Sequence, residues 1–317
     1  MTASNRSRRI EAIYPLSPMQ QGMLFHTLLE PESGAYFEQM ACRLRGALDV
    51  DAFERAWKQV VARHAALRTA FAWRGSEKPV QAVAREASLP FEVLDWRDAS
   101  PEESERRYRE FLQSDRARGF DLSRAPLMRI ALLRFGDVEH GLVWSFHHIL
   151  LDGWTYPILL GEVFSLYEAA CRGETARLPD PRPYRDYIAW LERQDGKAAR
   201  EFWTRELAGF ERSTPLPTVR FAKPGARSSF EKLEVSFGPD LTASLEEFAR
   251  SLGVTLSTLL HGAWGLVLAR HAGEADVVFG STVSGRPADL AGSEGMVGLF
   301  INTLPVRVRV DEGAEVG

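Results

Sequence analysis

The sequence predicts an α/β protein built from two lobes of layered helices and strands. Segments with the two-residue alternation of strands and segments with the three-to-four-residue spacing of helices follow one another in both halves of the chain. Interleaving of this kind is typical of sheets covered by helices. The length of 317 residues, with 45% hydrophobic and 26% charged residues, is sufficient for two hydrophobic cores.

The first part of the chain carries the clearest patterns. A helix is expected directly after Ser17, because that side chain can cap it and Met19, Met23 and Leu24 recur at helical spacing. Further helices are expected over 49–64, 101–118 and 155–171. Strands are expected over 35–45, 67–73, 79–83, 91–94, 127–134 and 139–148.

A polar stretch rich in proline, residues 172–183, is the predicted linker between the lobes. It places the first lobe at 1–177 and the second at 178–317. In the second lobe, helices are expected over 184–207, 241–251 and 256–271, and strands over 232–237, 277–281 and 300–310.

The composition excludes several classes of protein. The net charge is −4 and the 39 Lys and Arg residues form no basic stripe, so a nucleic-acid partner is not expected. Cys42 and Cys171 are too few for a disulfide framework, and no Cys/His cluster has the spacing of a zinc site. Residues 1–9 are polar and no apolar run has the length of a membrane span, which predicts an unprocessed cytoplasmic protein without a membrane partner.

The most informative segment is His147-His148, followed by Asp152 and Gly153, at the end of a predicted strand. Because successive strand side chains point to opposite faces, His148 is expected to share a face with Trp144 rather than with His147. Imidazole titrates near neutrality, which suits a general base that Asp152 holds in place. A buried, hydrogen-bonded histidine pair that merely closes a strand is the structural alternative.

Other common catalytic motifs are missing from the sequence. It has no Gly-x-Ser-x-Gly nucleophile elbow, no Walker phosphate loop and no dinucleotide-binding Gly-x-Gly-x-x-Gly. A histidine without a covalent partner suits direct transfer of an acyl group between two bound substrates.

Four further segments extend the double-histidine motif, at 17–24 (Ser-Pro-Met-Gln-Gln-Gly-Met-Leu), 63–71 (Arg-His-Ala-Ala-Leu-Arg-Thr-Ala-Phe), 184–190 (Tyr-Arg-Asp-Tyr-Ile-Ala-Trp) and 298–307 (Gly-Leu-Phe-Ile-Asn-Thr-Leu-Pro-Val-Arg). In this order, the five segments resemble the motifs of the condensation domains of nonribosomal peptide synthetases. The match covers nearly the whole chain.

The resemblance implies two lobes, each similar to chloramphenicol acetyltransferase, that form a V around a tunnel. Donor and acceptor carrier proteins would each present a thioester on a phosphopantetheine arm, and the acceptor amine would attack the donor carbonyl. It implies no directly bound cofactor, no metal and an adenylation domain in the parent synthetase. Since family members continue through further motifs, the second lobe is expected to be incomplete at Gly317.

The resemblance also assigns roles to single residues. His148 would be the catalytic histidine, supported by His147 and by Asp152, which would pair with Arg68. Gly153 would let substrate approach closely. The segment 284–298 would form the floor of the tunnel, and further tunnel residues would be Trp154, Asn302, Ser17 and Gln20.

Several alternatives stay open at this stage. His148 could deprotonate the amine, orient it or stabilise the tetrahedral intermediate. A helix starting after Gly153 could favour an oxyanion through its dipole, or Asp152-Gly153 could be a simple turn and cap. The motifs are most similar to domains that join an L-configured donor to an L-amino acid, with a starter-acylating domain as the second subtype. A coenzyme A-dependent acyltransferase and a non-catalytic docking domain are the alternative functions.

Overall fold

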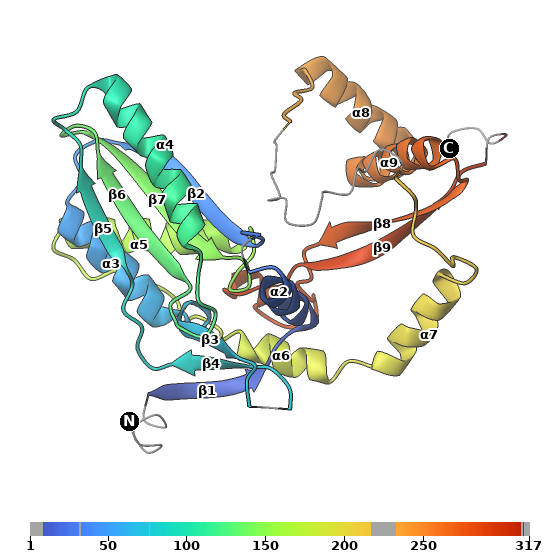
Figure 1. Ribbon diagram of the computed structural model, residues 1–317, viewed down its shortest axis with the longest axis horizontal. Helices are drawn as coiled ribbons and strands as arrows, with labels where there is room; N and C mark the ends of the chain where they lie inside the picture. The colour runs from blue at the N-terminus through green and yellow to red at the C-terminus, as the bar shows by residue number, and fades with distance from the viewer. Residues whose placement is uncertain (1–8, 32, 76, 217–232, 312, 314–317) are drawn as a thin grey trace. The chain divides into compact units, whose positions relative to one another are not determined.

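The computed structural model describes all residues except 1–8, 32, 76, 217–232, 312 and 314–317 (Figure 1). The chain divides into two compact units: Met1–Gln194 with Ser284–Ile301, and Asp195–Val283 with Asn302–Gly317. The predicted boundary at 177/178 therefore falls inside the first unit, together with the predicted linker. The late segment Ser284–Ile301 returns to the first unit rather than staying with the second.

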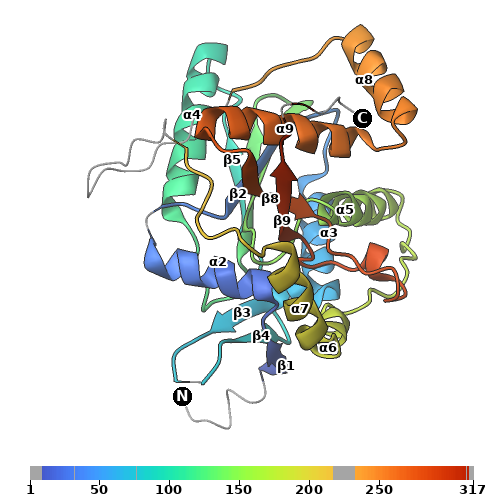
Figure 2. The same cartoon turned by 90° about the vertical axis from the view of Figure 1, so that its right-hand side faces the viewer.

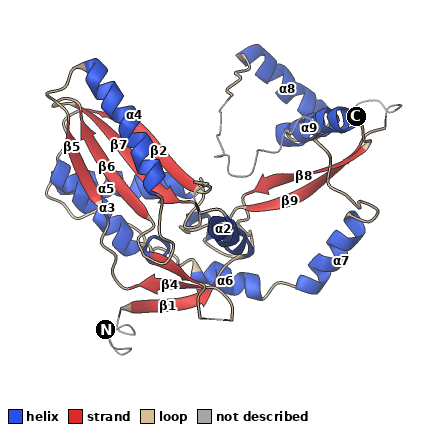
Figure 3. Ribbon diagram, in the orientation of Figure 1, coloured by secondary structure: helices blue, strands red, loops and turns tan. Residues whose placement is uncertain are grey.

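The first unit contains a four-stranded sheet in the order β2 (Phe37–Arg45), β7 (Glu139–His147), β6 (Met128–Arg134), β5 (Phe91–Asp95). Figure 3 shows these strands in red between helices on both faces. β2, β7 and β6 pair antiparallel, and β5 pairs parallel to β6. The register sets Phe37 opposite His147, so the double histidine lies at the start of β2 and the end of β7.

The two faces of this sheet have different partners. Trp144 and Phe146 pack on one face in the main core with Trp57 of α3 (Val50–Arg63), which lies beside α5 (Thr155–Cys171) (Figure 2). Val143 packs on the other face with apolar side chains of α4 (Pro101–Arg118). The alternation of strand side chains thus gives the sheet two cores.

A second sheet of the first unit has the order β1 (Ile10–Pro15), β4 (Val80–Ala84), β3 (Thr69–Ala72), with a short 3₁₀ helix at Ala65–Arg68 before β3. Helix α2 (Pro18–Leu29) follows β1 and begins with the predicted cap. The Ser17 hydroxyl accepts from the amide of Gln20 at 3.2 Å, and the Gln20 side chain accepts from the amide of Ser17 at 3.0 Å. Helix α6 (Arg185–Glu192) and a 3₁₀ turn at Ser293–Gly295 complete the unit.

The second unit contains α7 (Gly196–Glu206), α8 (Pro239–Ser251), α9 (Leu256–Ala272) and the antiparallel pair β8 (Asp276–Val283) and β9 (Asn302–Arg309). The predicted helix over 184–207 is broken because Asp195 caps α7, accepting from the amides of Lys197 and Ala198 at 2.9 and 3.0 Å. The predicted strand over 232–237 is wrong for 233–237, which have no regular structure; Lys232 lies outside the described residues.

α8 and α9 carry large exposed apolar side chains, among them Phe248 and Trp264. Among the described residues, no single helix is long and apolar enough to cross a membrane. The α8 and α9 segments reach that length and composition only together, as a pair bent by 97°.

Candidate active site

His147 is the last residue of β7, and its ring is buried. The amide of Ile149 donates to its Nδ1 at 3.2 Å, so the ring proton belongs on Nε2, which lies 3.4 Å from the Thr27 hydroxyl. Burial, followed by the neighbouring His148, lowers the pKa of His147 to about 4. His147 is therefore a neutral ring that holds the turn after β7.

His148 follows the strand and is partly exposed. The strand ends at His147, so the alternation of side chains does not set the direction of His148. A turn does: the amides of Leu150 and Leu151 donate to the carbonyls of His147 and His148 at 3.1 and 3.3 Å. The Nδ1 atom of His148 is buried and has no hydrogen-bond partner among the described residues.

Asp152 is 0% exposed, and four donors surround its carboxylate. The amides of Phe300 and Ile301 donate to Oδ2 at 2.8 and 3.2 Å. The Thr155 hydroxyl donates to Oδ1 at 3.2 Å, and Arg286 lies 3.5 Å from the same atom. None of the contacts joins Asp152 to the His148 ring, so Asp152 fixes the chain around the histidine and does not orient the imidazole directly.

The predicted pairing of Arg68 with Asp152 is wrong. Arg68 is 6% exposed and pairs through Nη1 with Glu11 of β1 at 2.7 Å, and it also donates to the carbonyls of Ala84 and Arg85 at the end of β4. These contacts tie β1 to β4, and they give the buried guanidinium a carboxylate partner other than Asp152.

Arg286 takes the place that the sequence assigned to Arg68. It also donates through Nη1 to the carbonyls of Ser293 and Met296, and its guanidinium lies 4.0 Å from the centre of the Phe300 ring. Burial lowers the pKa of Arg286, and the charge of Asp152 opposes that shift. Arg286 was missed because it lies 134 residues from Asp152, within a stretch notable only for glycine, serine and proline.

The returning segment Ser284–Ile301 is held by a second contact at Gly298. A Cβ on Gly298 would lie 2.1 Å from Cδ2 of Tyr184, so only glycine fits against this ring. The Tyr184 hydroxyl donates to the carbonyl of Leu299 at 2.5 Å, and Tyr184 and Tyr187 pack on Phe300. The fourth and fifth sequence motifs are therefore packed together in one cluster.

Ser17 and Gln20, which the sequence assigned to the tunnel, lie at the start of α2. Both are buried, and their polar atoms form the cap of α2. Gln20 also donates through Nε2 to the carbonyl of Ile149 at 3.1 Å. Its side chain therefore supports the turn that carries the histidines.

The remaining predicted site residues are exposed. Trp154 is 55% exposed and donates through Nε1 to the carbonyl of Glu294 at 3.0 Å. Gly153 is exposed, and a Cβ there would meet no atom within 4 Å. Asn302 begins β9 in the second unit, where its Oδ1 accepts from the amide of Thr303 at 2.9 Å.

Helix α5 begins at Thr155, directly after this turn. Its first amides bond to main-chain carbonyls: Thr155 to Asp152 at 3.0 Å and Tyr156 to Gly153 at 3.4 Å. The Asp152 carboxylate is not the cap, since it points to Phe300 and Ile301. The turn-and-cap interpretation therefore holds for the main-chain carbonyls of Asp152 and Gly153 and not for the Asp152 side chain.

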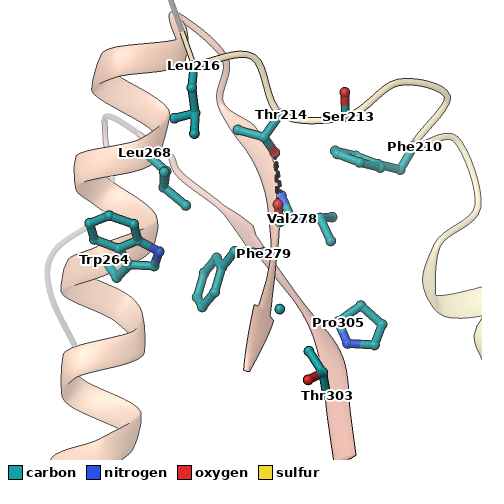
Figure 4. Close-up of a pocket in the computed structure, with 11 residues that line it drawn as sticks. Phe210, Ser213, Thr214, Leu216, Trp264, Leu268, Val278, Phe279, Thr303 and Pro305 are labelled. Carbon is teal, nitrogen blue, oxygen red and sulfur yellow. Dashed lines mark hydrogen bonds between the residues drawn. The ribbon is translucent and has the colours of Figure 1, made fainter. Parts of the chain in front are cut away.

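A cavity of about 550 Å³ lies in the second unit and is lined by apolar side chains, including Trp264, Leu268 and Phe279 (Figure 4). At its wall, the Thr214 hydroxyl bonds to the backbone of Val278 at 2.9 and 3.0 Å. None of the predicted site residues lines it. Within the described parts of the chain, no group of three or more His, Cys, Asp or Glu residues is arranged to hold a metal ion.

The profile of the family described as "Condensation domain" matches residues 10–317. The chain belongs to the condensation domain family. This confirms the resemblance to the condensation domains of nonribosomal peptide synthetases that the five motifs predict.

The sequences of two peptide synthases agree with this assignment. The condensation domain is 46% identical over 315 residues to a component of the linear gramicidin synthase of Brevibacillus parabrevis, and 41% identical over 306 residues to bacitracin synthase 1 of Bacillus licheniformis. These alignments cover 98% and 96% of the chain but only 4% and 6% of the relatives.

Solved structures show the same α/β fold. The first condensation domain of the calcium-dependent antibiotic synthetase, in complex with a substrate analogue, aligns with a TM-score of 0.78 at 21% identity, over 96% of this chain and 71% of that one. The structure of the X-domain with OxyB from teicoplanin biosynthesis contains a chain that aligns with a TM-score of 0.76 at 26% identity, over 95% and 65%.

Proposed function

We propose that this condensation domain forms an amide bond between a donor acyl or peptidyl thioester and the amine of an acceptor aminoacyl thioester, with His148 as its catalytic residue. The observation that supports the proposal is that the residues of the double-histidine motif differ in burial and in hydrogen bonding. His147 is buried and neutral, and Asp152 is buried and fully engaged by donors. His148 is the partly exposed titratable group that remains.

The reaction makes modest chemical demands on that group. The amine nitrogen forms a bond to the donor carbonyl carbon, the carbon–sulfur bond breaks, and one proton passes from the amine to the departing thiolate. A free α-amine has a pKa of about 7.7 to 8, so a useful fraction is neutral near pH 7. His148 orients this amine and carries its proton in the transition state.

The partners follow from the relatives. We infer that the substrates are carried by donor and acceptor carrier domains on phosphopantetheine arms, in a synthetase that also contains adenylation domains and acts in the cytoplasm. The identities of 41–47% to peptide synthases favour carrier-bound thioesters over free coenzyme A thioesters. An L-configured donor and an L-amino acid acceptor remain the preferred substrate class.

The test is single-turnover amide formation from loaded carriers with His148→Ala. We expect the rate to fall at least about a hundredfold, as is typical when a general acid or base is removed. His271→Ala is the matched control, because His271 is exposed in the last turn of α9 and should leave the rate unchanged. Equal rates in the wild type and in His148→Ala would remove His148 from the mechanism.

A second candidate function is docking without catalysis. It is favoured by the similarity to the chain solved in the complex of the X-domain and OxyB. Amide formation by the wild type under the conditions above excludes it. A wild-type chain that binds a partner protein but forms no amide would support it.

A further inference from the structure

Tyr36, which directly precedes β2, has an unusual backbone conformation. Its φ is 63°, and it is the only non-glycine residue with positive φ in the part of the chain that the structure describes. Side chains other than glycine rarely adopt this left-handed region, and aromatic residues pay a steric penalty in it. Such a conformation persists only where neighbouring contacts hold it, and it is concentrated at functional sites.

Tyr36 is hydrogen-bonded to the turn that carries His148. The amide of His148 donates to the carbonyl of Tyr36 at 2.8 Å. This bond extends the pairing of β2 and β7 beyond Phe37 and His147, past the end of β7. The direction of the Tyr36 carbonyl therefore helps to set the backbone of His148.

The side chain of Tyr36 is held between two histidines. Its hydroxyl lies 2.8 Å from Nδ1 of His26, and the two ring planes are nearly parallel, at an angle of 7° with their centroids 6.2 Å apart. The Tyr36 ring also lies 6.2 Å from the ring of His147, at an angle of 48°. His26 thus contacts Tyr36 through one hydrogen bond, which joins two nearly coplanar rings.

Helix α2 supports the whole turn (Figure 1). Thr27 contacts the His147 ring at 3.4 Å, and Gln20 donates to the carbonyl of Ile149 at 3.1 Å. His148, which lies between His147 and Ile149, has no direct hydrogen bond to α2. Its amide bonds to Tyr36, and the Tyr36 hydroxyl bonds to His26 of α2. The helix is itself anchored by its capping box and by buried Met23.

We propose that Tyr36 is a positioning residue for His148, and that His26 keeps Tyr36 in its left-handed conformation. The proposal rests on the catalytic role of His148 proposed above. Without the contact to His26, Tyr36 relaxes toward negative φ and its carbonyl turns away from the His148 amide. A small displacement of a catalytic group is enough to slow a reaction, because the attacking geometry is narrow.

The first test is kinetic and uses Tyr36→Phe, His26→Leu and the double variant. We expect each single change to lower kcat about tenfold with little change in KM, because a positioning residue acts through His148 and not through substrate binding. The double variant should be no slower than the slower single variant, since both remove one unit. His26→Gln, which keeps a hydrogen-bonding group, should restore most of the rate, and Tyr108→Phe on α4 is the control.

The second test does not depend on activity. Hydrogen exchange at the His148 amide should become about tenfold faster in Tyr36→Phe and in His26→Leu, while the Leu142 amide within β7 keeps its protection. Unchanged exchange at His148 in both variants would overturn the proposal, as would additive kinetic effects. Faster exchange at His148 in a domain whose wild type forms no amide would keep the positioning role and overturn the proposed function instead.

Discussion

Two buried aspartates of the first unit each meet an arginine, and they hold the molecule in different ways. Asp115 of α4 binds three neighbouring strands from one side: it accepts from Gln39 of β2 at 2.8 Å, from Ser145 of β7 at 2.5 Å and from Arg129 of β6 at 2.5 Å. Asp152, in the turn after β7, binds the main-chain amides of the distant residues Phe300 and Ile301.

The arginine lies much closer to its aspartate at one site than at the other. At Asp115 it is the closest charged partner, and it also donates to the Asp115 carbonyl at 2.6 Å. At Asp152 the arginine, Arg286, lies at 3.5 Å while an amide lies at 2.8 Å. Asp115 therefore joins a helix to a sheet by an ion pair, whereas Asp152 joins two distant parts of the chain mainly by main-chain hydrogen bonds.

The largest effects should come from removing either carboxylate. Asp115→Ala and Asp152→Ala each leave a buried arginine and other donors unpaired, so we expect each to lower the free energy of unfolding by about 3 to 5 kcal/mol. Only Asp152→Ala should expose the segment Ser284–Ile301 to limited proteolysis. Denaturant titration and mapping of the first cleavage sites check this, and early cleavage there in Asp115→Ala would remove the distinction.

Acid should affect the turn after β7, through His147, and the Asp115 site over different pH ranges. Burial and His148 lower the pKa of His147 from 6.5 to about 4, so the unfolded chain takes up a proton in that range and the folded chain does not. The free energy of unfolding should fall by about 3 kcal/mol as the pH drops from 6.5 to 4. His147→Gln should flatten this slope in denaturant titrations at several pH values.

The Asp115 site should not contribute to that slope. Burial raises the pKa of Asp115, but the hydrogen bonds from Ser145 and Arg129 outweigh it and keep the pKa below the usual 3.8. Its stabilisation is present above pH 3.8 and is lost only as the pH falls further. If the free energy of unfolding of His147→Gln still falls between pH 6.5 and 4, a group other than His147 is responsible for the pH dependence.

Replacing the arginines should give smaller and unequal losses. Arg129→Met leaves Asp115 without its close cation, and we expect a loss of about 3 kcal/mol. Arg286→Met leaves Asp152 with two amides and the Thr155 hydroxyl, so we expect about 1 kcal/mol. Thermal and denaturant unfolding of both variants test the difference, and equal losses would show that Asp152 depends on its ion pair as strongly as Asp115 does.

The contrast between the two aspartates also shows what the sequence could predict. Both α4 and α5 have the predicted bounds, because the Ser100 cap and the end charges of α4 and the apolar spacing of α5 are local signals. The double-histidine motif was likewise recognisable from one short segment. Strand β1, which is short and ends in proline, was missed.

Long-range partners were not predictable from these local signals. Asp152 and Arg286 are 134 residues apart, and nothing in either segment indicates that they meet. The motif position of Arg68 predicts a pairing with Asp152, but its partner in the structure, Glu11, belongs to β1, which the sequence does not predict. The contacts of Tyr36 depend on a backbone angle that no residue pattern signals, because tyrosine seldom adopts it.

The smallest effect on stability is expected beside Asp152, at Gly153. Its φ is outside the left-handed region and an added Cβ meets no atom within 4 Å, so Gly153→Ala should change the free energy of unfolding by less than about 0.5 kcal/mol. Gly298→Ala is the contrasting variant, because its Cβ would collide with the Tyr184 ring, and it should be clearly destabilised. If Gly153 is glycine so that substrate can approach the turn, Gly153→Ala should still slow single-turnover amide formation about tenfold. A fully active, fully stable Gly153→Ala would show that neither the fold nor the reaction needs glycine there.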